Sequence, residues 1–202
     1  MARIILMRHG RGEFDFDDAY GRWLSANAMA ELIDNYETTG LAQPQSPPDD
    51  TKHLAQSASY AVSSPLPRAL ASLLALRMDV EFTTDPVFTE VPMARPASLS
   101  FLGKIPLPVI VWSVLLRLLW WLRLAKGKEG YGASIIRTRI AALRLEETAT
   151  QHGTVFLSGH GFFNHMLGKQ LRKQGWLEKT DVISSTVSSG YWACKVFDKT
   201  LP

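Results

Sequence analysis

The sequence predicts an α/β protein, a three-layer α/β/α sandwich with a mostly parallel central sheet. Short apolar segments alternate with longer segments of helical periodicity along most of the chain, the order expected of parallel strands joined by helices. Two of the apolar segments, 4–7 and 154–158, each run into a histidine followed by a glycine. Ligands of open α/β sheets bind at the carboxyl ends of strands, so this pair predicts a two-histidine site at one edge of the sheet.

The first half of the chain contains strand signals separated by helix and turn signals. Ala28, Leu32 and Ile33 recur at helical spacing after Ser25, a residue type favoured at helix N-caps, and Gly40 follows the end of this pattern. Proline and acidic residues fill a loop further on. We predict a strand at 2–7, a helix at 25–36, a loop at 43–50, a strand at 60–63, a helix at 69–77 and a strand at 80–83.

The second half repeats the alternation. A long helix over 133–151 is predicted to turn one apolar face to the core, formed by Ile135, Ile136, Ile140, Leu143 and Leu145. A strand at 154–158, a helix at 163–174 and a last strand at 191–197, which closes the sheet, follow.

Composition points to one globular domain over residues 1–202, with room for a full core. Hydrophobic residues make up 46% and charged residues 20%, an ordinary globular profile. The formal charge of +3 suits an anionic substrate but is too small to indicate nucleic acid. The single cysteine, Cys194, excludes an internal disulfide, and the short N-terminal apolar run is no signal peptide. We therefore expect a cytoplasmic protein.

Three strand ends and one loop supply the side chains that carry chemistry. Arg8 and His9 follow the first strand, Arg68 and His160 follow two others, and Glu90 lies in a loop. An arginine pair suits a phosphate, because each guanidinium binds two oxygens in a planar fork. A neutral histidine beside such a clamp can attack phosphorus, a second, protonated one can stabilise negative charge, and a glutamate can transfer protons. These groups suffice for phosphoryl transfer without a metal or other cofactor, and no carboxylate cluster has metal-ligand spacing.

With these residues the chain resembles the histidine phosphatase superfamily, which shares its fold with phosphoglycerate mutases. The matching motifs are LMRHG at 6–10, SSPLPRALAS at 63–72, FTE at 88–90 and SGHG at 158–161. The resemblance implies a phosphoglycerate mutase-like fold and a small phosphorylated substrate. It also implies that His9 is the nucleophile, that Arg8, Arg68 and His160 form the phosphate pocket, and that Glu90 is the proton donor.

The chain departs from the mutase pattern directly after the first motif. Mutase-like members continue with an acidic residue and a hydroxyl residue, then an asparagine six positions after the histidine. Arg11, Gly12 and Asp15 stand at these positions, which argues against phosphoglycerate mutase activity. Asp15 would disfavour a second anionic group, whereas Arg11 could replace part of the lost contacts. We expect the substrate-binding residues to include Arg11, Asp15, Arg95 and Gly161.

Residues 107–124 form the most apolar segment of the chain, within a predicted cap-like insertion at about 91–132. Prolines at 106 and 108 place a helix start near 109–112. The run is too short to span a bilayer and is interrupted by Arg117. A stripe at helical spacing is predicted to face the core, formed by Trp112, Leu115, Leu116, Leu119 and Trp120.

Other apolar side chains of this segment lie outside the stripe, so three roles stay open for it. The helix could cap the active site, form a homodimer interface, or contact a membrane surface or lipid substrate. Four cations would favour the last role: Arg117, Arg123, Lys126 and Lys128.

We consider three functions. The first is a metal-independent phosphatase acting on a small phosphomonoester through a phosphohistidine. The second is a phosphatase that removes phosphate from phosphohistidine in proteins, which a cap over the site would obstruct. The third is a catalytically idle member that binds a membrane or partner through the apolar helix. The intact set of His9, Arg8, Arg68 and His160 argues against the third, because a binding module does not need it.

Overall fold

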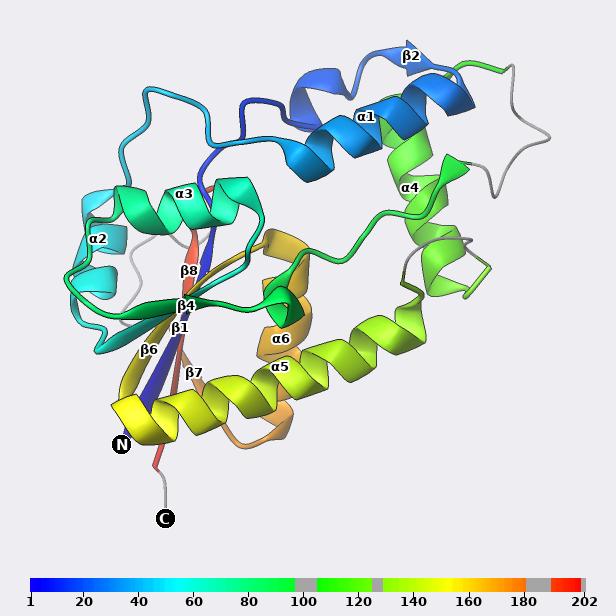
Figure 1. The fold of residues 1–202 in the computed structure, drawn as a ribbon. Helices are drawn as coiled ribbons and strands as arrows, with labels where there is room; N and C mark the ends of the chain where they lie inside the picture. The colour runs from blue at the N-terminus through cyan, green and yellow to red at the C-terminus, as the bar shows by residue number, and fades with distance from the viewer. Residues whose placement is uncertain (97–104, 125–128, 181–189, 201–202) are drawn as a thin grey trace.

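The protein is built around a mostly parallel, six-stranded sheet (Figure 1). The computed structural model describes residues 1–96, 105–124, 129–180 and 190–200. The strand order is β4-β3-β6-β1-β8-β7; β4, β3, β6 and β1 are mutually parallel, whereas β8 is antiparallel to β1 and to β7. The strands are β1 (Ala2–Arg8), β3 (Tyr60–Ser63), β4 (Phe82–Thr84), β6 (Thr154–Gly159), β7 (Leu177–Lys179) and β8 (Cys194–Lys199).

Helices cover both faces of this sheet, which confirms the predicted three layers (Figure 1). Side chains of β1 alternate between the faces: Ile5 and Met7 pack with α2 and α3, whereas Ile4 and Leu6 pack in the cluster that contains α5 and α6. The helices are α2 (Asp49–Gln56), α3 (Pro67–Ala75), α5 (Tyr131–His152) and α6 (Gly161–Lys173).

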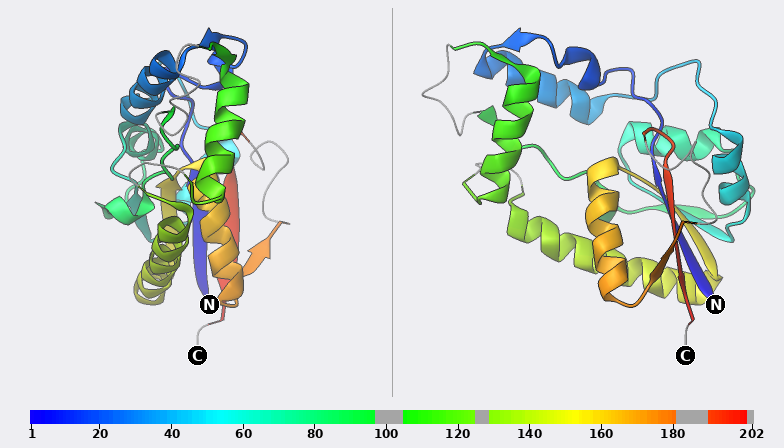
Figure 2. Two further views of the ribbon diagram at one scale, coloured as in Figure 1. Left: turned by 90° about the vertical axis from the view of Figure 1, so that its right-hand side faces the viewer. Right: turned by 180° about the vertical axis from the view of Figure 1, so that it is seen from behind.

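Two further helices, α1 (Ala26–Thr38) and α4 (Val109–Trp121), lie beyond the carboxyl ends of the central strands (Figures 1 and 2). As predicted, Ser25 caps α1, because its hydroxyl accepts a hydrogen bond from the backbone of Ala28. A short antiparallel pair, β2 (Trp23–Leu24) with β5 (Leu107–Pro108), joins the starts of the two helices.

The apolar segment forms α4 where the sequence places it. Trp112, Leu116 and Trp120 are buried, and the indole Nε1 of Trp112 donates to the carbonyl of Leu24 at 2.8 Å. The helix therefore packs on the core through the predicted stripe. Within the described residues, no helix is both long and apolar enough to cross a membrane. Lys126 and Lys128 lie outside the described residues.

The predicted apolar face of the long helix is wrong in part. Ile136, Ile140 and Leu143 are 63%, 42% and 54% exposed, whereas Leu145 is buried. At about 100° per residue, Leu145 lies half a turn away from Ile136, so these residues never shared one face. The buried side of α5 consists mainly of small residues, which let the helix approach the sheet closely: Ser134, Thr138, Ala141, Ala142, Leu145 and Ala149.

Other helix and strand boundaries differ from the predicted ones for local reasons. The helix predicted at 69–77 begins at Pro67, a residue well suited to a first helical position. The last strand begins at Cys194 rather than 191, because Trp192 has a positive φ of 62°. That strand does not close the sheet: it lies between β1 and β7. The sequence analysis missed α2, β7 and two short 3-10 helices, η1 (Asp17–Ala19) and η2 (Pro86–Phe88).

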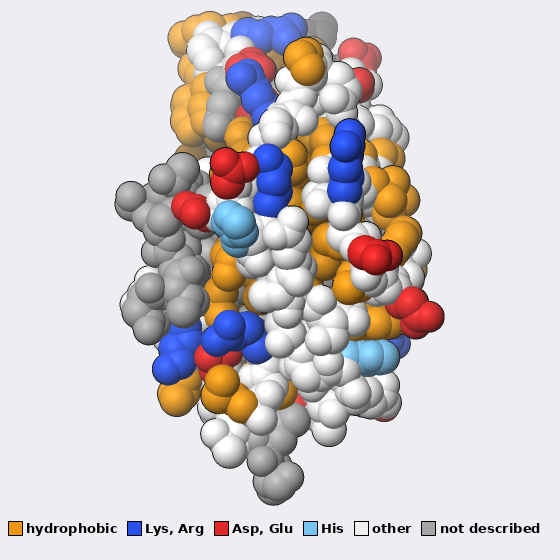
Figure 3. Space-filling view, turned by 90° about the vertical axis from the view of Figure 1, so that its left-hand side faces the viewer, with side chains coloured by type: hydrophobic (Ala, Val, Ile, Leu, Met, Phe, Trp, Pro, Cys, Tyr) orange, Lys and Arg blue, Asp and Glu red, His pale blue; other side chains and the backbone are white. Residues whose placement is uncertain are grey.

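Charged side chains are dispersed on the face seen from the side of α2 and α3. Figure 3 shows Lys and Arg side chains there separated by acidic, polar and apolar ones. The described part of this face therefore offers no continuous basic surface of the kind that binds nucleic acid.

Candidate active site

Three neighbouring strands bring the two histidines together. β1 pairs with β6 so that Arg8 lies opposite Gly159, and β3 flanks β6 on its other side. The residues that follow β1 and β6 are His9 and His160, and the centroids of their rings are 5.1 Å apart. The predicted two-histidine arrangement at the carboxyl edge is therefore present.

His9 is held as a neutral ring whose lone pair lies on Nε2. Its Nδ1 lies 2.6 Å from the carbonyl oxygen of Gly10, and its Nε2 lies 3.1 Å from Nε of Arg68. A guanidinium can only donate and a carbonyl can only accept, so these contacts assign the proton to Nδ1 and the lone pair to Nε2. Burial, followed by the charge of Arg68, lowers the pKa of His9 from 6.5 to about 3.

The turn after His9 leaves no room for a larger residue. A Cβ at Gly10 would lie 2.4 Å from the side chain of Trp192. The backbone N–H of Gly10 donates to Ser72 at 2.9 Å, and the Ser72 hydroxyl donates to the carbonyl of Arg68 at 2.6 Å. The glycine, and the serine on α3, therefore tie the turn that follows His9 to the helix that carries Arg68.

Two aromatic rings support the two arginines. Arg68 is 1% exposed; its Nη1 donates to the carbonyl of Tyr36 at 2.9 Å, and its Cζ lies 4.5 Å from the centroid of that ring. The Cζ of Arg8 lies 4.2 Å from the ring centroid of Tyr191. Such stacking holds a planar guanidinium in one orientation and leaves its edge for an oxyanion.

His160 is fully buried, and Ser64 fixes its ring. Nε2 of His160 lies 2.8 Å from the Ser64 hydroxyl, whereas Nδ1 is a buried nitrogen without a hydrogen-bond partner in the described structure. Burial first, then the neighbouring His9 and arginines, moves the pKa of His160 well below 6.5. A protonated second histidine was expected from the sequence, whereas burial and the neighbouring positive charges favour the neutral ring.

Glu90 reaches the site from the loop after η2. Its Oε1 accepts hydrogen bonds from the backbone of Val91 at 2.8 Å and of Phe163 at 3.0 Å. Phe163 belongs to the first turn of α6, whose backbone N–H groups have no acceptor within the helix. The loop is therefore anchored to the same helix that follows His160.

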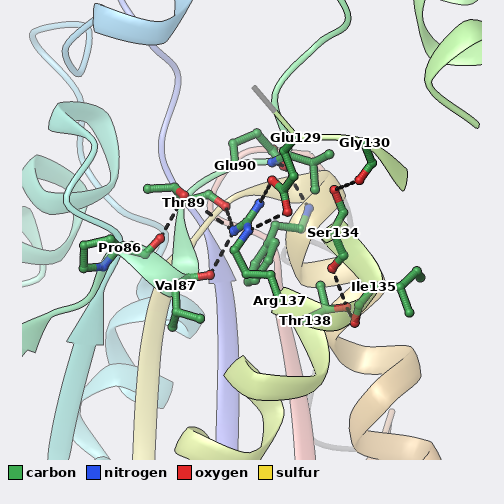
Figure 4. Close-up of polar contacts among 12 residues, drawn as sticks. Pro86, Val87, Thr89, Glu90, Glu129, Gly130, Ser134, Ile135, Arg137 and Thr138 are labelled. Carbon is green, nitrogen blue, oxygen red and sulfur yellow. Dashed lines mark hydrogen bonds and ion pairs between the residues drawn. The ribbon is translucent and has the colours of Figure 1, made fainter. Parts of the chain in front are cut away.

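Arg137 of α5 holds this loop from the other side (Figure 4). Its Nη1 donates to the carbonyls of Val87 and Thr89 at 2.9 and 2.7 Å, and its Nε and Nη2 form two hydrogen bonds to Glu129. A bidentate pair of this kind fixes both partners. The carbonyls that it binds lie directly before Glu90, so Arg137 sets the position of that carboxylate.

Two hollows meet at these residues. The first, which we call the apolar cavity, has a volume of about 600 Å³ and is lined by Arg8, Arg68 and Glu90 together with Phe16, Tyr20, Ile33, Tyr36, Val91 and Met93. The second has a volume of about 470 Å³ and is lined by His9, with Arg8, Tyr36 and Glu90 in common with the first. Of the predicted phosphate-binding residues, Arg8 lines both hollows and Arg68 lines the apolar cavity, whereas His160 lines neither. Among the described residues, no group of three His, Cys, Asp or Glu side chains is placed to hold a metal ion.

The four predicted substrate-binding residues separate into two pairs. Asp15 lines the apolar cavity and accepts a hydrogen bond from the hydroxyl of Tyr191, and Gly161 lines the second hollow beside Arg8. Arg11 instead pairs with Asp18 at an exposed position and lines neither hollow. Arg95 likewise lines neither, because its guanidinium pairs with acidic side chains of α1. The structure does not bring Arg11 and Arg95 to the site.

Several residues at the site were not selected from the sequence. Ser64 lies within a motif that was recognised, so its hydroxyl could have been considered. Tyr36, Tyr191, Arg117 and Arg137 lie far from every motif, and local sequence gives no signal for them.

Comparison with known proteins rests on structure alone, because no family model and no curated protein matches the sequence. Mycobacterial glucosyl-3-phosphoglycerate phosphatase superposes with a TM-score of 0.56 at 18% identity, over 85% of this chain and 80% of that one. Phosphoserine phosphatase from Entamoeba histolytica gives a TM-score of 0.55 at 17% identity, over 99% of this chain and 98% of that one. The chain has the histidine phosphatase fold.

A third structure with this fold is ecdysone phosphate phosphatase from Bombyx mori, solved in complex with tungstate. It gives a TM-score of 0.54 at 13% identity, over 100% of this chain and 93% of that one. The superpositions confirm the phosphoglycerate mutase-like architecture expected from the sequence. In this histidine phosphatase fold, two of the recognised motifs, at 6–10 and 158–161, end the paired strands β1 and β6.

Proposed function

We propose that the protein is a metal-independent phosphatase that hydrolyses a phosphomonoester through a phosphohistidine on His9. The observation that carries the proposal is the state of His9. The ring is buried and neutral, and its Nε2 lone pair accepts a hydrogen bond from the guanidinium of Arg68. A neutral nitrogen beside an arginine is equipped to attack a phosphorus atom whose oxygens the arginine binds. Several structures of this fold are named as phosphatases, which supports the same assignment.

The proposed reaction has two steps. Nε2 of His9 attacks phosphorus and the bond to the alkoxide breaks, while Glu90 donates a proton to the departing oxygen. Water then attacks the phosphohistidine, Glu90 takes the proton, and inorganic phosphate leaves with His9 restored. Arg8, Arg68 and His160 bind the phosphoryl oxygens throughout. Positioning and electrostatic stabilisation supply most of the acceleration.

His160 takes part as a hydrogen-bond donor. If the Ser64 hydroxyl donates to Nε2, the proton of the neutral ring lies on Nδ1, the nitrogen that has no partner in the described structure. That N–H would be free to bind a phosphoryl oxygen. Arrival of the anion would also raise the pKa of His160 and favour the protonated form in the complex.

The cavity favours a small molecule over a phosphoprotein. Tyr20 and Met93, and Ser113 and Arg117 of α4, line the cavity beside the catalytic residues. A wall of this kind limits the approach of a protein surface but suits a small ester.

The first test is hydrolysis of p-nitrophenyl phosphate in the presence of a chelator. We expect chelator-resistant turnover that His9→Ala abolishes and that His53→Ala, at an exposed histidine on α2, leaves unchanged. Alkaline quench during turnover, followed by mass spectrometry under alkaline conditions, should show one phosphate on the peptide containing His9. Full activity of His9→Ala, or turnover without a phosphorylated peptide, would refute the mechanism.

A further inference from the structure

The apolar cavity adjoins a groove beside α4. Three residues, Met93, Ser113 and Arg117, line both the cavity and this groove. The groove, which we call the α4 groove, has a volume of about 460 Å³. In the left view of Figure 2, α4 faces the viewer, on the side of the molecule away from α2 and α3.

The remaining walls of the α4 groove are apolar, formed by Val114, Leu118, Trp121 and Phe162. Three of them are large exposed side chains: Val114 is 60%, Leu118 46% and Trp121 58% exposed. Exposed apolar side chains that adjoin one another, beside a cavity, are typical of a ligand-binding surface. Of the predicted core stripe of α4, Trp112, Leu116 and Trp120 are buried, whereas Leu115 and Leu119 are half-buried. The second, exposed apolar face therefore requires a separate explanation.

Charged side chains of both signs line the apolar cavity in equal number. Four are carboxylates and four are guanidinium groups: Asp15, Glu37, Glu90 and Glu129, with Arg8, Arg68, Arg117 and Arg137. At the junction with the groove, the Cζ of Arg117 lies 4.3 Å from the ring centroid of Phe162 and 5.2 Å from that of Trp120. Its guanidinium is thus placed against aromatic rings, and burial lowers its pKa.

We propose that the substrate is an amphiphile, a phosphate monoester of a long apolar alcohol. Its phosphate would lie at His9, the first part of its chain in the apolar cavity, and the rest in the α4 groove. This inference rests on the proposed function, since it places the phosphate in the same site. The two hollows share Met93, Ser113 and Arg117 as lining residues, and we therefore assign the groove to the chain of this same molecule.

The test is a series of linear alkyl phosphates from butyl to dodecyl, each below its critical micelle concentration. We expect kcat/KM to rise by up to about fourfold for each added methylene, the factor that corresponds to burial of one CH₂. Leu118→Gln should remove the rise for the longer chains and leave butyl phosphate unchanged. Ile110→Gln is the matched control, because Ile110 lies on the same helix, is 44% exposed and does not line the groove.

Binding provides a readout that does not depend on turnover. In the His9→Ala protein, calorimetry should show dodecyl phosphate binding more tightly than butyl phosphate, and Leu118→Gln should remove the difference. Chain-selective binding without any hydrolysis by the wild-type protein would refute the proposed function and support the amphiphilic ligand. Hydrolysis that depends on His9 but not on chain length would support the proposed function and refute the amphiphilic substrate.

Three other results would overturn the inference. Preference for 5-carboxypentyl phosphate over hexyl phosphate would indicate that Arg117 binds a second anion. A dimer that Leu118→Gln converts to a monomer, with chain-length dependence unchanged, would assign the groove to self-association. Binding to phosphatidylcholine vesicles without selectivity among dissolved alkyl phosphates would assign it to a membrane surface.

Discussion

At the scale of single residues, the site keeps two histidines neutral inside a group of arginines. Burial and the charge of Arg68 lower the pKa of His9 to about 3, and His160 shifts in the same direction. A protonated His9 would have no lone pair on Nε2 to attack phosphorus. In the proposed mechanism, burial and the charge of Arg68 therefore keep His9 able to attack phosphorus at neutral and mildly acidic pH.

These shifts predict a loss of stability in acid. Between about pH 6.5 and pH 3 the unfolded chain protonates His9 and the folded protein does not, so the free energy of unfolding falls as the pH falls through this window. For one such histidine the loss is about 1.4 kcal/mol per pH unit. Urea denaturation at pH 7 and pH 5 should therefore show a smaller difference for His9→Gln than for the wild-type protein.

Replacement of the exposed His53 by glutamine is the control for this experiment, and it should keep the wild-type difference. Equal pH dependence in wild type and His9→Gln would mean that His9 is protonated in the folded protein at pH 5.

At the scale of elements, the position of Glu90, the proposed acid–base residue, depends on two helices that do not carry it. Glu90 lies on a loop, and the loop is fixed by Arg137 of α5 and by the N-terminal turn of α6. A loop residue held by two helices can be positioned as firmly as one within a strand. Arg137 is thus a positioning residue that acts through Glu90.

Leaving-group dependence distinguishes this role from a general structural one. Glu90→Gln should lower kcat for hydrolysis of an alkyl phosphate by about 10²- to 10⁴-fold. It should lower kcat for p-nitrophenyl phosphate far less, because nitrophenolate departs without a proton. Arg137→Met should likewise lower kcat more for the alkyl phosphate than for p-nitrophenyl phosphate, but by a smaller factor. The measurement is the ratio of the two kcat values. Arg139→Met, at an exposed position on the same helix, should leave the ratio unchanged. Equal losses on both substrates in Arg137→Met would contradict the positioning role.

At the scale of the whole molecule, α4 belongs to the main hydrophobic core. Trp112, Leu116 and Trp120 of α4 lie in one continuous cluster with residues of β1, α5 and α6. The helix that walls the cavity is therefore not an independent flap. Its stability and that of the sheet should be coupled.

Truncation of Leu116, which is fully buried, tests this coupling. Leu116→Ala should lower the free energy of unfolding by about 2–5 kcal/mol and keep a single transition, monitored together by far-UV and near-UV circular dichroism. Leu118→Ala, at an exposed position on the same helix, should change stability by less than about 0.5 kcal/mol. Two separate transitions in Leu116→Ala would show that α4 unfolds on its own.

Local sequence determined the parts of the protein that depend on neighbouring residues. Apolar runs such as 4–7 and 154–158, each followed by a histidine and a glycine, specified buried strands and the side chains at their ends. The order of strands and helices then specified the layers. The core face of α4 could also be predicted from the sequence, because Trp112, Leu116 and Trp120, which are buried, repeat at helical spacing.

Tertiary structure alone decided which other side chains reach the site. Tyr191 meets Asp15 across 176 positions of the chain, and Arg68 meets His9 across 59. Arg11 and Arg95 were plausible by charge, yet ion pairs on other surfaces hold them. Contacts of this kind depend on how separate elements pack, and the periodicity of one element carries no information about the surface that it meets.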